Sequence, residues 1–138
     1  MRRLAAAVLL LAAVMLPACG DSTGPGLGLG VSTGTYTLQT INGNALPYTV
    51  DDGAGTVVVI LSDAFTLQNG GRFTETFSLR VTENGTTTTE SNTNAGAWTL
   101  AGTTVRLTFD VDGLSISGTL SGGVLTIVDE GLSLVYRR

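Results

Sequence analysis

Few side chains in this sequence are suited to chemistry, and most of those are acids. The chain has eleven Asp and Glu residues, seven basic residues that are all Arg, a single Cys and no His. Without His, Lys or a second thiol, the usual catalytic triads, Cys–His pairs and Schiff bases cannot form. The common zinc ligand sets are excluded for the same reason. We therefore expect a protein that is not an enzyme and holds no metal or cofactor.

Glu75 is the acid whose spacing is most informative. It alternates with Phe73, Phe77 and Leu79, so it shares one face of a strand with three apolar side chains. If that face is the inside of a barrel, Glu75 can anchor an amine or hydroxyl of a ligand, and desolvation would raise its pKa. The alternative is a position at the open end of the strand or opposite an Arg. The candidate ligand-lining residues are Tyr36, Phe73, Glu75, Phe77 and Trp98.

Two pairs of Asp invite comparison with calcium sites, because oxygen ligands at alternate positions suit that ion. They are Asp51-Asp52-Gly53 and Asp110-Val111-Asp112-Gly113. Neither has the remaining ligands of an EF-hand loop, and Asp-Gly is ordinary turn chemistry. We expect turns here. An enzyme using Glu75 or the Asp110 and Asp112 pair is the least favoured hypothesis, and it requires two carboxyl groups that converge in a cleft.

The elements that must position these side chains are β-strands. No helical stripe is visible in residues 34–138, whereas apolar and polar residues alternate with period two between clusters of Gly, Asn and Asp. The alternating segments are residues 36–38, 57–61, 65–67, 73–82, 86–93, 98–100, 104–109, 114–120 and 124–128, with a last strand ending at Tyr136.

Short turns separate these segments, and Asn84-Gly85 is the strongest hairpin signal among them. Short connections force neighbouring strands to be antiparallel, since a parallel connection needs a dozen residues or more. We therefore predict an all-β fold, a single antiparallel meander of about 8–10 strands. A closed or nearly closed barrel hides its edges best, and a β-sandwich is the alternative.

The first residues have the features of an export signal. Arg2 and Arg3 precede an unbroken apolar run at residues 4–16, which small side chains follow. A basic start, an apolar run of this length and a cleavage site with small residues are typical of a signal peptide. The run is too short for a spanning helix, which needs about 20 apolar residues.

The segment Leu16-Pro17-Ala18-Cys19 resembles the lipobox of bacterial lipoproteins. The resemblance implies cleavage before Cys19, a diacylglycerol on its thiol and a further acyl chain on its amino group. Two or more chains make membrane binding stable. Lipidation also accounts for a lone Cys in an exported protein. Gly20 follows Cys19 in place of the Asp that retains lipoproteins in the inner membrane, so we expect a bacterial cell-envelope protein, by default at the outer membrane.

Three parts of the chain follow from these features: a signal peptide at residues 1–18, a Gly-rich tether at residues 19–33 and one folded domain at residues 34–138. The tether has too few bulky side chains to offset the entropy of ordering it. After cleavage, five Arg and eleven acidic residues remain, so the formal net charge is near −6. This argues against a nucleic-acid partner, and we expect a monomer.

Three short motifs resemble the small lipocalin-like domains of bacterial lipoproteins: Gly34-Thr35-Tyr36, Ile41-Asn42-Gly43 with Leu46-Pro47, and Gly96-Ala97-Trp98. The resemblance implies a lipid-anchored barrel that binds a small apolar molecule, with a pocket at a barrel mouth near Trp98 and Tyr36. The alternative is an interaction or inhibitor-like module that contacts an envelope protein through its loops or the hairpin at residues 84–95.

Overall fold

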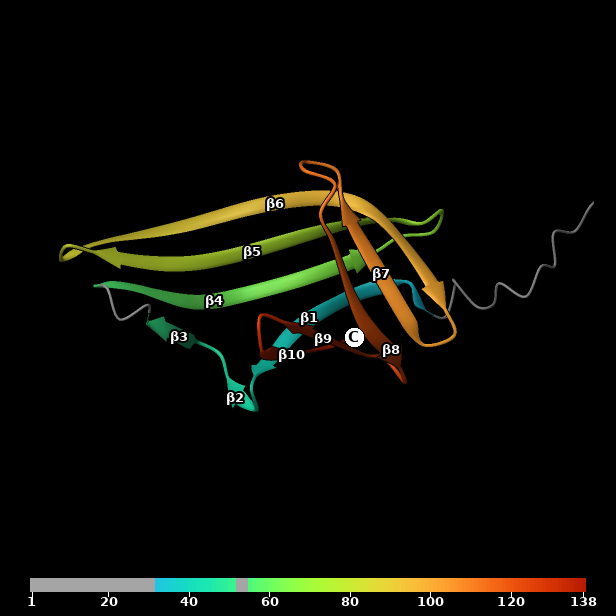
Figure 1. Ribbon diagram of the computed structural model, residues 1–138, viewed down its shortest axis with the longest axis horizontal. Helices are drawn as coiled ribbons and strands as arrows, with labels where there is room; N and C mark the ends of the chain where they lie inside the picture. Colours follow the sequence, from blue (N-terminus) through green and yellow to red (C-terminus); the bar gives the residue numbers. More distant parts are fainter. Residues whose placement is uncertain (1–31, 52–54) are drawn as a thin grey trace, which may run out of the picture.

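The computed structural model describes residues 32–51 and 55–138. The predicted signal peptide, the Cys19 lipidation site and the predicted tether up to residue 31 lie outside these residues. The described chain is almost entirely β-structure (Figure 1). Its strands are β1 (Gly34–Ile41), β2 (Asn44–Ala45), β3 (Tyr48–Asp51), β4 (Thr56–Leu67), β5 (Arg72–Glu83), β6 (Thr86–Ala101), β7 (Thr104–Phe109), β8 (Ser115–Ser121), β9 (Val124–Asp129) and β10 (Leu132–Arg137).

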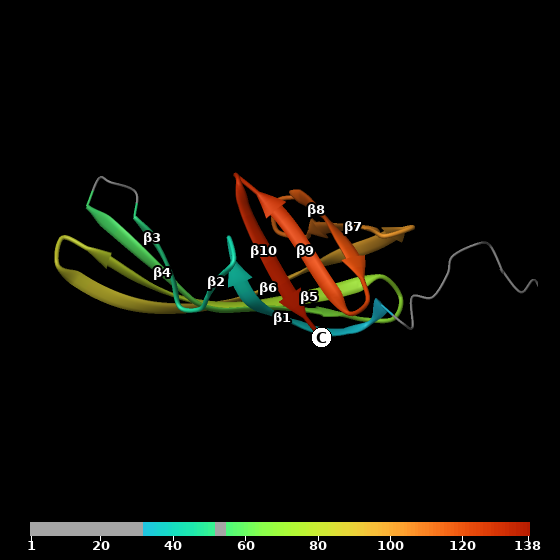
Figure 2. The same cartoon turned by 90° about the horizontal axis from the view of Figure 1, so that it is seen from below.

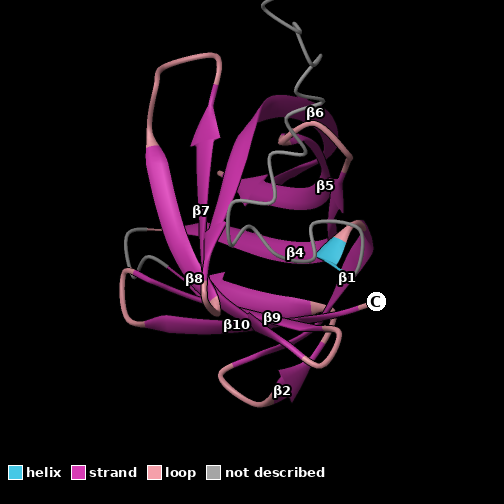
Figure 3. Cartoon of the chain, turned by 90° about the vertical axis from the view of Figure 1, so that its right-hand side faces the viewer, coloured by secondary structure: helices cyan, strands magenta, loops and turns pink. Residues whose placement is uncertain are grey.

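The ten strands of the described residues form one antiparallel sheet that closes on itself. The sheet order is β2-β1-β10-β9-β8-β7-β6-β5-β4-β3, and a further pairing of β1 with β4 closes an eight-stranded barrel. Figure 3 shows this barrel from the side opposite the long hairpin of β5 and β6. The predicted all-β antiparallel barrel is confirmed, and the sandwich alternative is wrong. Strands β2 and β3 are additions at the two edges.

The hairpin between β5 and β6 forms where the sequence predicts it. Asn84 and Gly85 both have positive φ, at 50° and 76°, the conformation that a two-residue turn requires. Glu83 pairs with Thr86 beside the turn, and the register then runs without interruption to the pair of Arg72 and Ala97. This turn therefore fixes which residues of β6 lie opposite β5.

Strands β4, β5 and β6 are longer than the barrel needs, and their far halves form an arm with β3 (Figures 1 and 2). The pairing of β1 with β4 covers only four pairs, from Gly34 with Leu67 to Thr37 with Ala64. Beyond that point β1 continues with β10 and β2, whereas β4 continues with β3 and β5. The barrel mouth on this side, which we name the arm end, opens where β1 and β4 separate.

A bulge marks the start of the arm in β4. The register with β5 shifts between Ile60 and Ser62, so Leu61 is the extra residue. A bulge bends its strand and increases the local twist. It also keeps Ile60 opposite Leu79 while Asp63 lies opposite Phe77. Ile60 and Asp63 consequently face the same side of the sheet although three positions separate them.

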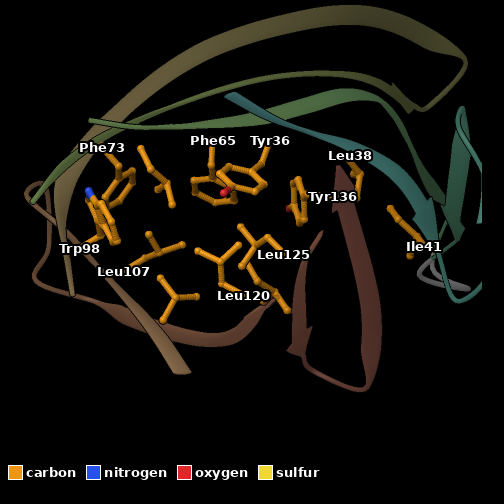
Figure 4. Packing of buried hydrophobic residues seen from close by; sticks show 13 residues of the cluster. Tyr36, Leu38, Ile41, Phe65, Phe73, Trp98, Leu107, Leu120, Leu125 and Tyr136 are labelled. Carbon is orange, nitrogen blue, oxygen red and sulfur yellow. The ribbon is translucent and has the colours of Figure 1, made fainter. Parts of the chain in front are cut away.

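The barrel interior is filled by apolar side chains (Figure 4). Three edge-to-face ring contacts join Phe65 to Phe73, Phe65 to Tyr136 and Phe73 to Phe109, with centroids 5.2–5.8 Å apart. The buried core consists of Tyr36, Leu38, Ile41, Phe65, Leu67, Phe73, Trp98, Val105, Leu107, Leu120, Leu125, Ile127 and Tyr136.

The mouth opposite the arm end is where both ends of the described chain lie, and we name it the terminal end. Arg138 donates a hydrogen bond from Nη1 to the carbonyl oxygen of Thr33 at 2.9 Å. Trp98 is 2% exposed at this end, and its indole Nε1 donates to the carbonyl oxygen of Gln68 at 3.0 Å. The buried indole and its satisfied N–H make Trp98 a structural part of the core.

Candidate functional site

A pocket of about 340 Å³ lies at the arm end of the barrel. Leu38 and Asp63 are the first residues past the last pair of β1 and β4, so the pocket lies where these strands separate. Half of its lining is apolar, and the polar part includes two carboxyl groups. The lining residues are Leu38, Ile60, Ser62, Asp63, Glu75, Phe77, Ser78, Leu79, Asn94 and Leu134.

The residues of β4 and β5 that face the interior form layers from the core outward. Phe65 and Phe73 are buried and form the floor. Glu75 lies directly opposite Phe65, and Asp63, two positions before Phe65, lies opposite Phe77, so both carboxyl groups lie between the buried floor and the arm. Ile60 and Leu79, which pair with each other, form an apolar rim toward the arm. The pocket thus has acidic groups deep inside and apolar groups at its opening.

Asp63 on β4 is held by Tyr136 on β10, a strand that is separated from β4 by β1 alone. The hydroxyl of Tyr136 donates to Oδ2 of Asp63 at 2.7 Å. Oδ1 of Asp63 is buried and has no hydrogen-bond partner among the described residues. Burial raises the pKa of Asp63 from 3.8 to about 7; the charge of Glu75 adds to this, and hydrogen bonding from Tyr136 and the Ala64 backbone opposes it. This carboxyl group therefore takes up and releases its proton much nearer to neutral pH than an exposed Asp does.

Glu75 lies on the neighbouring strand and is oriented by an amide. Asn94 is its direct partner across β5 and β6, and Asn94 Nδ2 donates to Glu75 Oε2 at 2.6 Å. Burial raises the pKa of Glu75, and the bond from Asn94 opposes that rise. Asp63 and Glu75 are diagonal neighbours on one face of β4 and β5, a placement that brings side chains within reach of each other.

The charged groups that line the pocket are all acidic. None of its lining residues within the described chain is basic. Arg80 is the nearest Arg along β5, but it alternates with Leu79 and therefore lies on the opposite face of the sheet. The pKa of the Tyr136 hydroxyl is raised by burial and then by the charge of Asp63, so this group stays a neutral donor.

The structure divides the candidate ligand-lining residues into two groups. Glu75 and Phe77 line the pocket at the arm end. Tyr36, Phe73 and Trp98 are instead buried in the core, with Trp98 at the terminal end. Tyr36 also lines a second hollow of about 440 Å³ at the terminal end, beside Ser121 and Arg137. Its hydroxyl donates to the carbonyl oxygen of Ser32 at 2.8 Å.

Of the two Asp pairs, the structure describes the side chains of Asp110 and Asp112, and each has a partner within the protein. Asp110 forms an ion pair with Arg72, which lowers the pKa of Asp110. Asp112 Oδ1 accepts a hydrogen bond from the backbone N–H of Leu114 at 2.8 Å, as an Asp in a turn commonly does. Asp52 lies outside the described residues. In the described part of the chain, no group of three or more Asp, Glu, His or Cys is arranged to hold a metal ion.

The sequence did not identify Asp63 or the two donors to the carboxyl groups, Asn94 and Tyr136. It also did not identify the polar lining residues Ser62 and Ser78. The signal for Asp63 was its alternation with Phe65 and Leu67, the same pattern that singled out Glu75. Asn94 could be found from the two-residue turn at Asn84-Gly85. An uninterrupted register counted back from this turn places Asn94 opposite Glu75. Tyr136 reaches Asp63 over 73 residues of sequence, and no local pattern predicts such a contact.

No model of a known protein family matches this chain, and no curated protein sequence matches it. Within residues 32–51 and 55–138, no helix is long and apolar enough to cross a membrane.

Proposed function

We propose that this protein is a lipid-anchored component of a bacterial cell envelope whose barrel binds a small, mainly apolar molecule without transforming it. The binding site in this proposal is the pocket at the arm end. The observation that carries it is the combination in one pocket of an apolar rim with a few polar groups deeper inside.

The size and lining of the pocket support ligand binding. Pockets for small molecules are typically about 300–1,000 Å³ in volume and combine apolar walls with a few polar groups that fix orientation. The value of about 340 Å³ is at the low end of that range. Leu38, Ile60 and Leu134 contribute apolar wall from three different strands, so a ligand would be enclosed from several sides.

The anchoring part of the proposal is supported by the sequence alone. Residues 1–18 have the order of a signal peptide, and Leu16-Pro17-Ala18-Cys19 resembles a lipobox. A lipid on Cys19 would keep the barrel beside a membrane. We place it at the outer membrane by default, as a monomer with no nucleic-acid partner.

Asp63 and Glu75 also form the arrangement that an enzyme of this composition would require, namely two carboxyl groups that converge in one cleft. Paired acids hydrolyse glycosides when one acts as a general acid and the other as a nucleophile or base. A sugar would bring many hydroxyl groups against Leu38, Ile60 and Leu79, and a polar group that is buried without a partner costs free energy. The apolar wall therefore favours binding of an apolar ligand over glycoside hydrolysis.

A protein-interaction function is the second candidate, and the arm favours it. Residues 86–94 of β6 pair with β5 on one side, and among the described residues no strand pairs with their other side. An unpaired strand edge can accept a strand of a partner. Residues 86–93 are exposed and consist of Thr, Glu, Ser and Asn, a polar composition that suits a solvated edge.

A fluorescence titration with the apolar probe N-phenyl-1-naphthylamine tests the proposed function. The purified protein should bind the probe saturably, measured against a blank of the same buffer and detergent. Ile60→Trp fills the pocket rim and should weaken binding at least tenfold, whereas Val128→Trp, at a site 68% exposed on β9, should not. Absence of saturable binding, or equal binding by the two variants, would contradict the proposal. A complex formed through the β6 edge would survive Ile60→Trp.

A further inference from the structure

The acidic layer of the pocket indicates the chemical class of its ligand. We infer that the pocket selects a primary amine with an alkyl or aryl group, whose ammonium lies between Asp63 and Glu75 and whose apolar part extends toward the arm. This inference rests on the proposed function, because it assumes that the pocket binds a small apolar molecule.

An unsatisfied hydrogen-bond acceptor of the site, Oδ1 of Asp63, supports an ammonium. Oδ1 of Asp63 is buried and has no hydrogen-bond partner among the described residues. Buried polar atoms are nearly always hydrogen-bonded, so an exception in a pocket calls for a missing partner. Asp63 Oδ2 already accepts from Tyr136, and Glu75 Oε2 accepts from Asn94. A primary ammonium has three N–H donors and no acceptor, so it can serve two carboxylates at once.

The missing counter-charge points to the same ligand class. Two carboxyl groups face one pocket, and none of the described lining residues is basic. Burying a carboxylate without a partner is costly, and the group then tends to bind a proton instead. A cation between the two groups supplies the missing charge. An alcohol would supply one hydrogen bond without the charge, and a carboxylate ligand would be repelled.

The layered order of the pocket sets the orientation of the amine. Glu75 lies opposite the floor residue Phe65 and Asp63 lies opposite Phe77, whereas Ile60 and Leu79 lie further toward the arm. The same face of the arm continues past the rim with Val58 opposite Val81. An ammonium held deep in the pocket therefore leaves an alkyl chain or ring against the rim and along the apolar face of the arm.

Three probes with the same eight-carbon chain and different head groups test the inference: n-octylamine, 1-octanol and octanoate. Isothermal titration calorimetry on the purified full chain at pH 7.5 measures each affinity, with detergent-matched blanks. We expect octylamine to bind at least tenfold more tightly than octanol, and octanoate more weakly than either.

Isosteric variants test whether the two carboxyl groups cause the preference for octylamine over octanol. Asp63→Asn and Glu75→Gln remove one charge each, and each should reduce the preference for octylamine over octanol at least threefold. Asp129→Asn removes an exposed carboxyl group outside the pocket and should leave the preference unchanged. Octanol binding that survives in all variants would show that they keep a folded pocket.

The possible outcomes separate the inference from the proposed function. Equal binding of octylamine and octanol would overturn the inference and leave the apolar pocket intact. Tighter binding of octanoate would overturn it as well. If none of the three probes binds, the proposed function and the inference both fail.

Carboxyl NMR gives a second measurement that reports on the site directly. The groups that face Asp63 are Glu75 on β5 and Tyr136 on β10, together with the neutral Asn94 on β6 and apolar Leu38 on β1. With octylamine bound, the ¹³C signal of the Asp63 carboxyl should titrate at a lower pH than in the free protein. Octylamine affinity should therefore rise between pH 5 and pH 8. A titration of Asp63 that octylamine leaves unchanged would contradict the inference.

Discussion

The hydroxyl of Tyr136 donates a 2.7 Å hydrogen bond to Oδ2 of Asp63, although β10 and β4 are not paired in the sheet. The bond passes over the inner face of β1, which pairs with both strands, at the level where β1 and β4 separate. The ring of Tyr136 packs against Phe65 with centroids 5.3 Å apart. One side chain thus contributes to the aromatic floor with its ring and holds the acidic layer with its hydroxyl group.

Tyr136→Phe should separate these two contributions. The ring and its packing are retained, but Asp63 loses the hydrogen-bond donor that favours its ionised form. We expect the pKa of Asp63 to rise above about 7 and the free energy of unfolding to fall by about 1–2 kcal/mol. Carboxyl NMR and urea denaturation measure the two effects.

Tyr36→Phe is the matched control for that substitution. It also deletes a buried tyrosine hydroxyl that donates a 2.8 Å hydrogen bond, but its acceptor is the carbonyl oxygen of Ser32 at the terminal end. Its effect on stability should be similar, and the titration of Asp63 should not change. A shift of the Asp63 pKa in Tyr36→Phe would indicate that the effect of Tyr136→Phe is not local.

Stability should decrease as pH rises from about 4 to about 7. The pKa of Asp63 is about 7 in the folded protein and near 3.8 in the unfolded chain, so between these values the folded state binds more protons. The raised pKa of Glu75 acts in the same direction. At about 1.36 kcal/mol per pKa unit, Asp63 destabilises the ionised protein by at most about 4 kcal/mol. Denaturant titrations at several pH values measure this slope.

Asp63→Asn should remove most of that pH dependence. Its amide oxygen still accepts the hydrogen bond from Tyr136 and carries no charge at any pH. We expect the variant to be more stable than the wild type at pH 8 by about 2–4 kcal/mol and nearly equal to it at pH 4. A wild-type slope that persists in Asp63→Asn would assign the pH dependence to other groups.

Gly96→Ala should disrupt the contact between β6 and the core. A Cβ at this position would lie 2.2 Å from the carbonyl oxygen of Thr108 and 2.5 Å from Cε1 of Phe73. Relieving both clashes requires movement of backbone and of a buried ring, which should cost about 3 kcal/mol. In Gly122→Ala the φ is 57° but no atom lies within 4 Å of the added Cβ, so we expect a cost of only about 1 kcal/mol. Thermal and urea denaturation compare the two variants.

Cys19→Ala tests the membrane anchor. Wild-type protein from a bacterial host should have an intact mass that begins at Cys19 and includes added acyl chains. The variant should lack that mass and should leave the membrane fraction. A soluble and unmodified wild-type product would contradict the anchoring proposal and would indicate ordinary secretion.

The strand pattern and the local turns were predictable because they depend on residues close in sequence. Asn84 and Gly85 tolerate positive φ, and they place the hairpin where it is observed. The alternation of Phe73, Phe77 and Leu79 indicated the inner face of β5. The barrel itself followed from short connections and from the need to hide strand edges, and the order of strands confirms it.

The composition of the pocket could not be predicted in the same way. It depends on where β1 and β4 separate, and these strands are distant in sequence. The bulge at Leu61 adds a further obstacle, because it changes which residues of β4 face inward. Trp98 was a candidate because it is large and aromatic, but size alone does not distinguish a residue that fills the core from one that lines a cavity. Tyr36 does both, since it is buried and also lines the hollow at the terminal end.

The two ends of the described chain meet at the terminal end, where Arg138 contacts Thr33, and the pocket opens at the other mouth. The protein can therefore be immobilised on a sensor chip through either end of this domain without covering the pocket. If Cys19 carries a lipid in the cell, as we propose, the anchor would be attached on the side of the terminal end, and the attachment itself would leave the mouth of the pocket uncovered.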